Sequence, residues 1–156
     1  LTQDAVPDSD SVTPISTYAG QGETILVVDD AEHQREIACK LLERLGYKTK
    51  AASSGEEAVE CLKQGSVDLV LLDMIMEPGM NGRETYERII ALHPAQKAIL
   101  VSGFAKTDEV KQAQQLGAGQ FIKKPYTIEK IGSAIKAELG TARPSQLYFD
   151  ERLGSA

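Results

Sequence analysis

The stretch ILVVDD at residues 25–30 decides the fold. Four consecutive apolar residues are typical of a strand that is buried on both faces, and the acidic pair Asp29–Asp30 ends the run. LVLLDM at 69–74 and AILV at 98–101 repeat the apolar run. Strands with one face in water usually alternate apolar and polar residues. Continuous runs therefore indicate a parallel sheet that is covered on both faces.

Amphipathic helical patterns lie between the apolar runs. In these segments apolar residues recur about every 3.6 positions, as in a helix with one face on the core. This alternation predicts a doubly wound α/β fold, namely a flavodoxin-like (βα)5 sandwich whose five parallel strands have the order 2-1-3-4-5. The expected strands are 25–28, 47–52, 68–72, 98–101 and 121–122, and the expected helices lie around 37–45, 54–62, 82–92, 107–116 and 128–135.

Individual side chains in these helices have expected roles. Ile37 is expected on the buried face of the first helix, and Leu116 on the buried face of the fourth. Ser54, with Glu57 three positions later, is expected to form a capping box at the start of the second helix.

The composition suits one folded domain with additional segments at its ends. The chain has 156 residues, of which 42% are hydrophobic and 26% charged, and this mixture excludes disorder throughout. Residues 1–22 are rich in Asp, Ser, Thr, Pro and Gly and are expected to be a flexible linker. Residues 23–140 would form the domain and 141–156 a tail whose role is left open. Leu1 in place of Met suggests an excised fragment or a processed product.

Charge and cysteine content narrow the functional classes. The net charge is −6, from 17 basic and 23 acidic residues, and the sequence has no Arg/Lys stripe, so direct nucleic-acid binding is disfavoured. The apolar runs are too short to cross a membrane. Cys39 and Cys61 lack metal-ligand spacing and are expected to be buried reduced thiols, which fits a cytoplasmic protein.

Polar and charged residues follow the ends of the predicted strands. Asp29 and Asp30 end the first strand, Asp73 ends the third, Ser102 ends the fourth, and Lys124 follows the fifth. In an open parallel sheet, ligands bind in the crevice outside the carboxyl ends of the strands. We therefore expect these five side chains to meet at one small cavity.

Three neighbouring carboxylates need a positive counter-charge. At about 4 Å and an effective dielectric of about 20, each pair would repel by about 4 kcal/mol. Lys124 supplies one positive charge, and oxygen ligands without His or Cys suit a hard divalent cation, Mg²⁺ or Mn²⁺. An unpaired carboxylate beside such an ion is a usable nucleophile, and Asp73 on the central strand is our candidate.

Each of these residues also has an ordinary structural explanation. A single Asp at a strand end is usually a turn or helix-cap residue, Ser102 alone would be a turn residue, and Lys124 alone would be a solvated charge. Their combination at matching strand ends favours a functional site. His33 and His93 have no partner at metal-ligand spacing and are expected at the surface. Three methionines are expected to serve packing: Met74, Met76 and Met80.

The motifs resemble the receiver domain of two-component response regulators. More narrowly, DMIMEPGMNGRETYERI at 73–89 is similar to receivers at the carboxyl end of hybrid sensor histidine kinases, where the polar leader would connect to a kinase domain. The chain has no ATP-binding Gly-rich motif of its own. The matching motifs are ILVVDD at 25–30, LVLLDM at 69–74, VSGFA at 101–105 and FIKKPYT at 121–127, within a similarity that covers about residues 23–140.

The resemblance implies the roles of the acidic residues. Asp73 would accept a phosphoryl group from the phosphohistidine of a histidine kinase or of a histidine phosphotransfer domain. Asp29 and Asp30 would hold Mg²⁺ together with Asp73 and the backbone carbonyl of Ile75. Lys124 would contact the acyl phosphate. The only chemistry of the domain itself would then be its own phosphorylation and dephosphorylation.

The resemblance also implies a conformational switch. Ser102 would contact the acyl phosphate, and Phe121 occupies the switch aromatic position. Phosphorylation would change the surface formed by 102–124, including the helix at 107–116. Lys124–Pro125 matches the family's usual Lys-Pro step, which is often a cis bond. Whether the domain forms a homodimer is left open.

Two departures from the common family pattern affect the site. Glu77 makes the loop after Asp73 one residue longer than usual, so the path of this loop is left open. Ile75 and Phe104 occupy the positions whose side chains border the phosphoryl group, and both are apolar. We expect them to exclude attacking water, or to leave it unoriented, and so to give a long-lived phospho-Asp73.

Two other functions use the same residues differently. A Mg²⁺-dependent phosphohydrolase could use the acid cluster, although typical aspartate-nucleophile hydrolases have a second Asp two residues after the nucleophile, where Ile75 stands. A phosphorylation-independent interaction module could retain the fold alone, although the intact Asp/Asp/Asp/Ser/Lys set argues against this. Whether the chain is an enzyme is therefore left open.

Overall fold

The computed structural model describes residues 18–76 and 78–140. Most of the expected linker (1–17), Glu77 and the expected tail (141–156) lie outside the described residues. Within them, five strands alternate with five helices. The strands are β1 (Thr24–Val28), β2 (Lys48–Ala52), β3 (Leu69–Asp73), β4 (Ala98–Ser102) and β5 (Phe121–Lys123). The helices are α2 (Glu32–Arg44), α3 (Gly55–Gln64), α4 (Gly82–Leu92), α5 (Asp108–Gln115) and α6 (Ile128–Leu139).

The strands form one parallel sheet in the order β2-β1-β3-β4-β5, so the predicted fold class and strand order are confirmed. The register pairs Val28 with Leu72 and Asp73 with Val101, which brings the carboxyl ends of the central strands to one edge. β3 begins one residue later than expected. Asp68 instead precedes the strand, and its carboxylate accepts a hydrogen bond from the N–H of Thr24.

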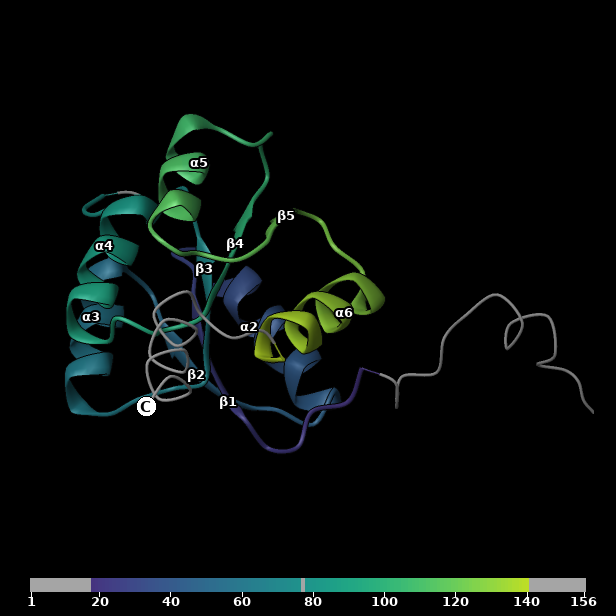
Figure 1. The fold of residues 1–156 in the computed structure, drawn as a ribbon. Helices are drawn as coiled ribbons and strands as arrows, with labels where there is room; N and C mark the ends of the chain where they lie inside the picture. The colour runs from purple at the N-terminus through teal and green to yellow at the C-terminus, as the bar shows by residue number, and fades with distance from the viewer. Residues whose placement is uncertain (1–17, 77, 141–156) are drawn as a thin grey trace, which may run out of the picture.

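Helices cover both faces of the sheet. Successive residues of a strand point to opposite faces, so the apolar strands supply two separate cores. Leu69 and Leu71 belong to the core that contains side chains of α2 and α6, whereas Val70 and Leu72 belong to the core beneath α3, α4 and α5. Figure 1 shows α3 and α4 on one side of the sheet and α6 on the other. This is the two-layer covering that continuous apolar strands require.

Two expected core residues are largely exposed. The exposed fraction is 49% for Ile37 and 44% for Leu116, so the prediction that they face inward is wrong. In α2 the buried stripe passes through Ala38 and Leu42 and leaves Ile37 at its edge. Leu116 is the residue at the C-terminal cap of α5, beyond the last turn that packs on the sheet.

The helix starts differ partly from expectation. The Ser54 side chain caps α3 by accepting the N–H of Glu57, but the Glu57 carboxylate accepts from the N–H and hydroxyl of Ser53 instead of closing a capping box. A complete capping box lies at α4, between Asn81 and Glu84. It starts α4 at Gly82, as the sequence predicted, despite the longer preceding loop.

Residues 18–22 contact the folded domain. The N–H groups of Gly20 and Gly22 donate to the carbonyls of Leu45 and Gly46 in the turn between α2 and β2. Gly20 also lies against the ring of Tyr47, where a Cβ would come within 2.3 Å of a ring carbon. The expected boundary between linker and domain at residues 22 and 23 stays a prediction.

The remaining expectations concern single side chains. Cys39 and Cys61 are free, as expected, but they are only partly buried. His33 is exposed, and His93 is partly buried, with Nε2 at 2.8 Å from the carbonyl oxygen of Leu62. The methionines serve packing as expected, since Met74 and Met76 are buried in one core and Met80 packs against that core. None of the described helices has the length and apolar character that a membrane crossing requires.

Candidate functional site

The carboxyl ends of β1, β3 and β5 bring four of the expected side chains together. Asp29 directly follows β1, Asp73 is the last residue of β3, and Lys124 directly follows β5. One carboxylate oxygen from each of Asp29, Asp30 and Asp73 lies within 4.8 Å of the others. The predicted meeting of these acidic residues is therefore what the structure shows.

Lys124 provides the positive charge of the cluster. Its Nζ lies 2.8 Å from Oδ2 of Asp29 and 3.6 Å from Oδ2 of Asp73. Asp29 and Asp73 are buried, whereas Asp30 is exposed at the rim. One ammonium group thus faces two buried carboxylates, and the cluster keeps an excess of negative charge.

Short turns after the strands hold the carboxylates in place. Oδ1 of Asp29 accepts the N–H of Ala31 at 2.9 Å, and Oδ1 of Asp73 accepts the N–H of Ile75 at 3.2 Å. In both cases an Asp side chain caps the backbone two residues later, as it does in an Asx turn. The second oxygen of each carboxylate stays directed to Lys124. The turn after β1 also lets neighbouring Asp29 and Asp30 approach the same point.

Asp73 has an unusual protonation equilibrium. Burial raises the pKa of its carboxyl from 3.8 to about 6, and the charges of Asp29 and Asp30 act in the same direction. Lys124 and the N–H of Ile75 lower this pKa but do not offset the effect of burial. The charge of the Asp73 carboxylate is therefore poorly compensated, and a further cation would stabilise it.

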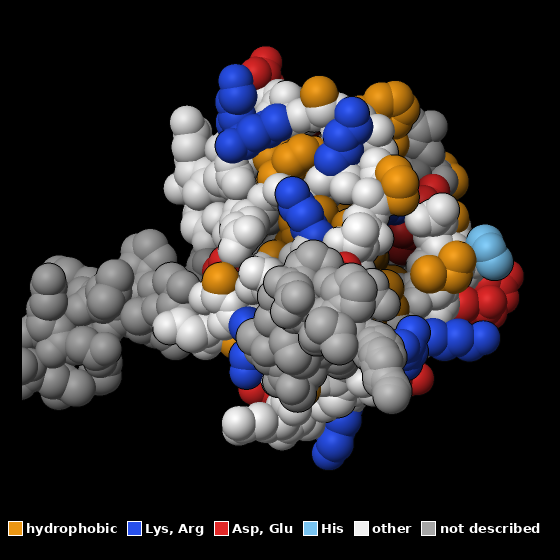
Figure 2. Space-filling model, turned by 90° about the vertical axis from the view of Figure 1, so that its right-hand side faces the viewer, with side chains coloured by type: hydrophobic (Ala, Val, Ile, Leu, Met, Phe, Trp, Pro, Cys, Tyr) orange, Lys and Arg blue, Asp and Glu red, His pale blue; other side chains and the backbone are white. Residues whose placement is uncertain are grey.

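A cavity of about 460 Å³ opens over the acidic cluster. Ile75 and Phe104 line it, with exposed fractions of 42% and 62%, so part of its wall is apolar. Figure 2 shows hydrophobic side chains interspersed with Lys and Arg side chains on one face of the molecule. A second cavity of about 570 Å³ lies at the opposite end of the strands, between Asp68 and Lys97, and is remote from the acidic cluster.

The two expected switch residues lie in β4 and β5. Ser102 is buried, and its Oγ accepts the N–H of Phe104 at 3.1 Å. Phe121 is partly buried, packs against the core beneath α5, and pairs with Leu100 of β4. Neither is among the described residues that line the cavity. The Lys124–Pro125 peptide bond is cis, as the resemblance implied.

Two residues near the site were missed from the sequence. Gln34, in the first turn of α2, lines the cavity. Arg35 donates from Nη1 to the backbone carbonyl of Asp29 at 2.8 Å. The available signal was an Arg six residues after Asp29, at the start of the helix that follows the acidic pair. Such spacing alone does not show that a side chain turns back toward its own strand.

The donor set fits a hard divalent cation. Carboxylate oxygens are the ligands that Mg²⁺ prefers, and this ion keeps several waters, for which the exposed position of Asp30 leaves access. The uncompensated charge at Asp73 supports the same fit. Asp29, Asp30 and Asp73 are the residues that would hold the ion.

The family model and the relatives that match this chain point to the same family. Residues 25–136 match the model of the response regulator receiver domain. The autoinducer 1 sensor kinase/phosphatase LuxN of Vibrio campbellii is 36% identical over 120 residues, which are 77% of this chain and 14% of LuxN. Sporulation initiation phosphotransferase F of Bacillus subtilis is 32% identical over 117 residues, which are 75% of this chain and 94% of that protein.

Solved structures agree with the sequence comparison. A CheY-like response regulator receiver domain protein from Methanospirillum hungatei has a TM-score of 0.71 and 29% identity. The match covers 76% of this chain and 94% of the other.

Proposed function

The chain belongs to the response regulator receiver domain family of two-component systems, and on that premise we propose that Asp73 accepts a phosphoryl group from a phosphohistidine. The observation that carries this proposal is the cluster of Asp29, Asp30 and Asp73 within 4.8 Å, with Lys124 Nζ at 3.6 Å from Asp73. The donor would be a histidine kinase or a histidine phosphotransfer domain.

The transfer is a substitution at phosphorus. An oxygen of the ionised Asp73 carboxylate forms the new bond to phosphorus, and the bond between phosphorus and the donor imidazole nitrogen breaks. The bonding electrons return to that nitrogen. Lys124 is close enough to Asp73 to donate to a phosphoryl oxygen. Mg²⁺, when bound by the three Asp residues, supplies further neutralisation of phosphoryl charge.

The backbone carbonyl of Ile75 is proposed as a further ligand of the ion. Ile75 lies at the cavity, and its N–H already contacts Asp73, so the peptide that follows Met74 is close to the acidic cluster. Mn²⁺ could take the same place as Mg²⁺, since both accept oxygen ligands.

Phosphorylation is proposed to change the surface formed by 102–124. The Ser102 hydroxyl, whose Oγ accepts the Phe104 N–H, would donate its hydrogen to a phosphoryl oxygen, and α5 and Phe121 would respond. Each charge-assisted hydrogen bond contributes about 1.5 to 3 kcal/mol. Two such bonds approach the roughly 5.5 kcal/mol that is needed to turn a 1:99 population into 99:1.

A larger parent protein is proposed from the relatives. LuxN is a sensor kinase/phosphatase of which the matched region is 14%, and it supports an origin in the receiver of a hybrid sensor histidine kinase. Histidine kinases use ATP, so we place this domain in the cytoplasm. Whether the domain forms a homodimer stays open, and the absence of direct nucleic-acid binding stays a prediction.

Intact-mass spectrometry after incubation with acetyl phosphate and Mg²⁺ tests the proposal. We expect the mass of one phosphoryl group to be added to the wild-type chain but not to Asp73→Asn. Steady release of phosphate from small phosphate esters, without this adduct, would instead favour the phosphohydrolase. Failure to accept phosphate from acetyl phosphate and from phosphohistidine donors would favour the interaction module.

A further inference from the structure

Asp29 is held at four points, and one of them is a side chain with no role in the proposed phosphoryl transfer. Its N–H donates to the carbonyl of Ala52 at 3.1 Å, and its carboxylate is held by Ala31 and Lys124. The fourth contact joins its backbone carbonyl to Nη1 of Arg35 at 2.8 Å. This contact fixes the backbone between the two acidic residues rather than a carboxylate.

Arg35 occupies an electrostatically unusual place. It lies in the first turn of α2, where the helix dipole disfavours a positive charge. The carbonyl of Asp29 offsets this cost, and Glu57 on α3 contributes. Hydrogen bonds from Ser53 lower the pKa of Glu57, and the charge of Arg35 acts in the same direction. Arg35 is therefore anchored at the turn after β1, and the charge of Glu57 favours its guanidinium group there.

A hydrogen bond at the Asp29 carbonyl also constrains Asp30. The peptide group that links them is planar, so the carbonyl of Asp29 and the Cα of Asp30 lie in one rigid unit. Asp30 is exposed, so core packing holds it less firmly than it holds Asp29. The orientation of this peptide therefore decides where the Asp30 carboxylate leaves the backbone.

We propose that Arg35 is a positioning residue for the cation site, because its hydrogen bond to the Asp29 carbonyl sets the peptide from which the Asp30 carboxylate projects. The inference rests on the proposed function, since it takes Asp29 and Asp30 as ligands of Mg²⁺. Side chains that orient metal ligands typically affect metal affinity about tenfold or more when they are removed.

Positioning and simple electrostatics predict opposite results. Arg35 carries a positive charge beside the turn that bears Asp29 and Asp30, and its removal would by charge alone strengthen the binding of a divalent cation. If the hydrogen bond to Asp29 positions the ligands, removal of Arg35 weakens binding instead. The direction of the change in Mg²⁺ affinity therefore separates the two effects.

The experiment compares Arg35→Met and Arg35→Gln with the wild-type chain by isothermal titration with Mg²⁺. We expect both variants to bind Mg²⁺ about tenfold more weakly. Hydrogen exchange of the Asp30 and Ala31 amides, measured by NMR in EDTA, is expected to become faster. If Arg35→Met does not fold, Arg35→Gln gives the same test with a polar side chain.

Arg44→Met is the matched control. Arg44 is exposed in the last turn of the same helix, nine residues and therefore about 14 Å along the axis from Arg35. That separation exceeds the Debye length of about 10 Å at 0.1 M salt, so we expect its Mg²⁺ affinity to stay within about twofold of wild type.

Equal or tighter Mg²⁺ binding by the Arg35 variants would overturn the inference. The titration contains no phosphate donor. A failure of Asp73 to accept phosphate would therefore overturn the proposed transfer, but the comparison of Mg²⁺ affinities would still test the role of Arg35. A wild-type chain that binds no Mg²⁺ would overturn the proposed ion and the role of Arg35 with it. Unchanged affinity in the Arg35 variants alone would overturn only the role of Arg35.

Discussion

Two groups of ion pairs, in each of which one basic side chain faces two carboxylates, differ in their exposure to water. At the acidic site, Lys124 faces Asp29 and Asp73, with side-chain exposed fractions of 18%, 9% and 8%. On the surface between α4 and α5, Arg83 faces Glu87 and Glu109, whose side chains are 46% and 47% exposed.

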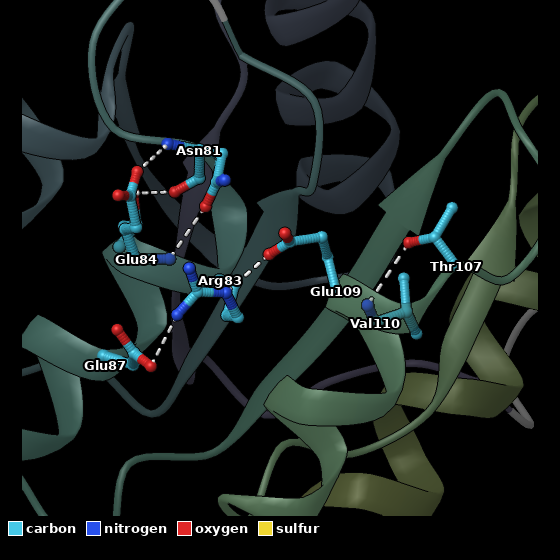
Figure 3. Close-up of polar contacts among 8 residues, drawn as sticks. Asn81, Arg83, Glu84, Glu87, Thr107, Glu109 and Val110 are labelled. Carbon is cyan, nitrogen blue, oxygen red and sulfur yellow. Dashed lines mark hydrogen bonds and ion pairs between the residues drawn. The ribbon is translucent and has the colours of Figure 1, made fainter.

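Figure 3 shows Arg83 between these two glutamates, one on its own helix and one on α5. Water can solvate the surplus negative charge there, whereas at the acidic site burial leaves it uncompensated. In both places one basic side chain faces two carboxylates, with Asp30 as a third carboxylate at the acidic site. Solvent access separates the structural ion-pair network from the candidate reactive site.

Removal of Lys124, the partly buried cation of the acidic site, should have the largest effect. Lys124→Met leaves Asp29 and Asp73 without a counter-charge, and we expect the free energy of unfolding in EDTA to fall by about 3 kcal/mol. Mg²⁺ should restore part of the loss by supplying positive charge. Urea unfolding followed by circular dichroism measures both. The control is Lys123→Met, one residue earlier and exposed. An equal decrease in the free energy of unfolding of Lys123→Met would contradict the special role of Lys124.

Removal of one buried carboxylate should have the opposite sign. In EDTA at pH 7, we expect Asp73→Asn to raise the free energy of unfolding by about 1 to 2 kcal/mol, allowing for residual solvent screening. The folded-state pKa of Asp73 is about 6 and its ordinary value is 3.8. Folding therefore favours the protonated carboxyl, and wild-type stability falls as pH rises through this window.

The pH dependence of that difference is itself a test. The gain from Asp73→Asn should be absent below about pH 4, grow between about pH 4 and 6, and stay constant above. Urea unfolding of both chains across this range gives the curve. A gain that does not vary with pH would show that the charge of Asp73 is not its cause.

The apolar wall of the cavity should slow the loss of phosphate. We expect Ile75→Asn to speed the decay of phospho-Asp73 about tenfold, or about 1.4 kcal/mol in activation free energy, because an amide can orient water. Intact-mass spectrometry over time measures the decay. Ile37→Asn, an exposed substitution on α2, is the control. Rapid decay in the wild type that Ile75→Asn leaves unchanged would contradict the expectation.

The surface network should give the smallest effect. Arg83→Met removes both ion pairs of Arg83, yet exposed pairs contribute little to stability. We expect a small decrease in Tm at low salt that disappears near 1 M NaCl, where the Debye length is about 3 Å. Thermal unfolding at two salt concentrations is sufficient. A decrease in Tm that is insensitive to salt, or as large as the decrease in Tm of Lys124→Met in EDTA, would remove the distinction between the two clusters.

Much of the fold could be predicted from local patterns. The apolar runs at β1, β3 and β4 indicated buried parallel strands, and α4 was predicted with its observed bounds from its periodicity and the following Pro94. Ile37 and Leu116 were placed wrongly because periodicity gives the direction of an apolar stripe but not its edges. The Asn81 capping box was missed because it depends on the path of the loop that enters the helix.

The sequence predicted which residues form the candidate site, but not the contacts between them. Parallel strands end at a shared edge, so the positions of Asp29, Asp73 and Lys124 after apolar runs implied that they would meet. The sequence did not indicate that Lys124 lies closer to Asp29 than to Asp73, or that Ser102 contacts Phe104. These contacts depend on side-chain rotamers and turn geometry.

The amino-acid sequence by itself determined which residues reach the edge of the sheet, because strand periodicity and strand order are properties of the chain. Only the tertiary structure decided how much water each charge retains and which donor each oxygen faces. The raised pKa of Asp73 and the contact from Arg35 to Asp29 are of this kind. Both result from burial and from segments that pack together only in the folded domain.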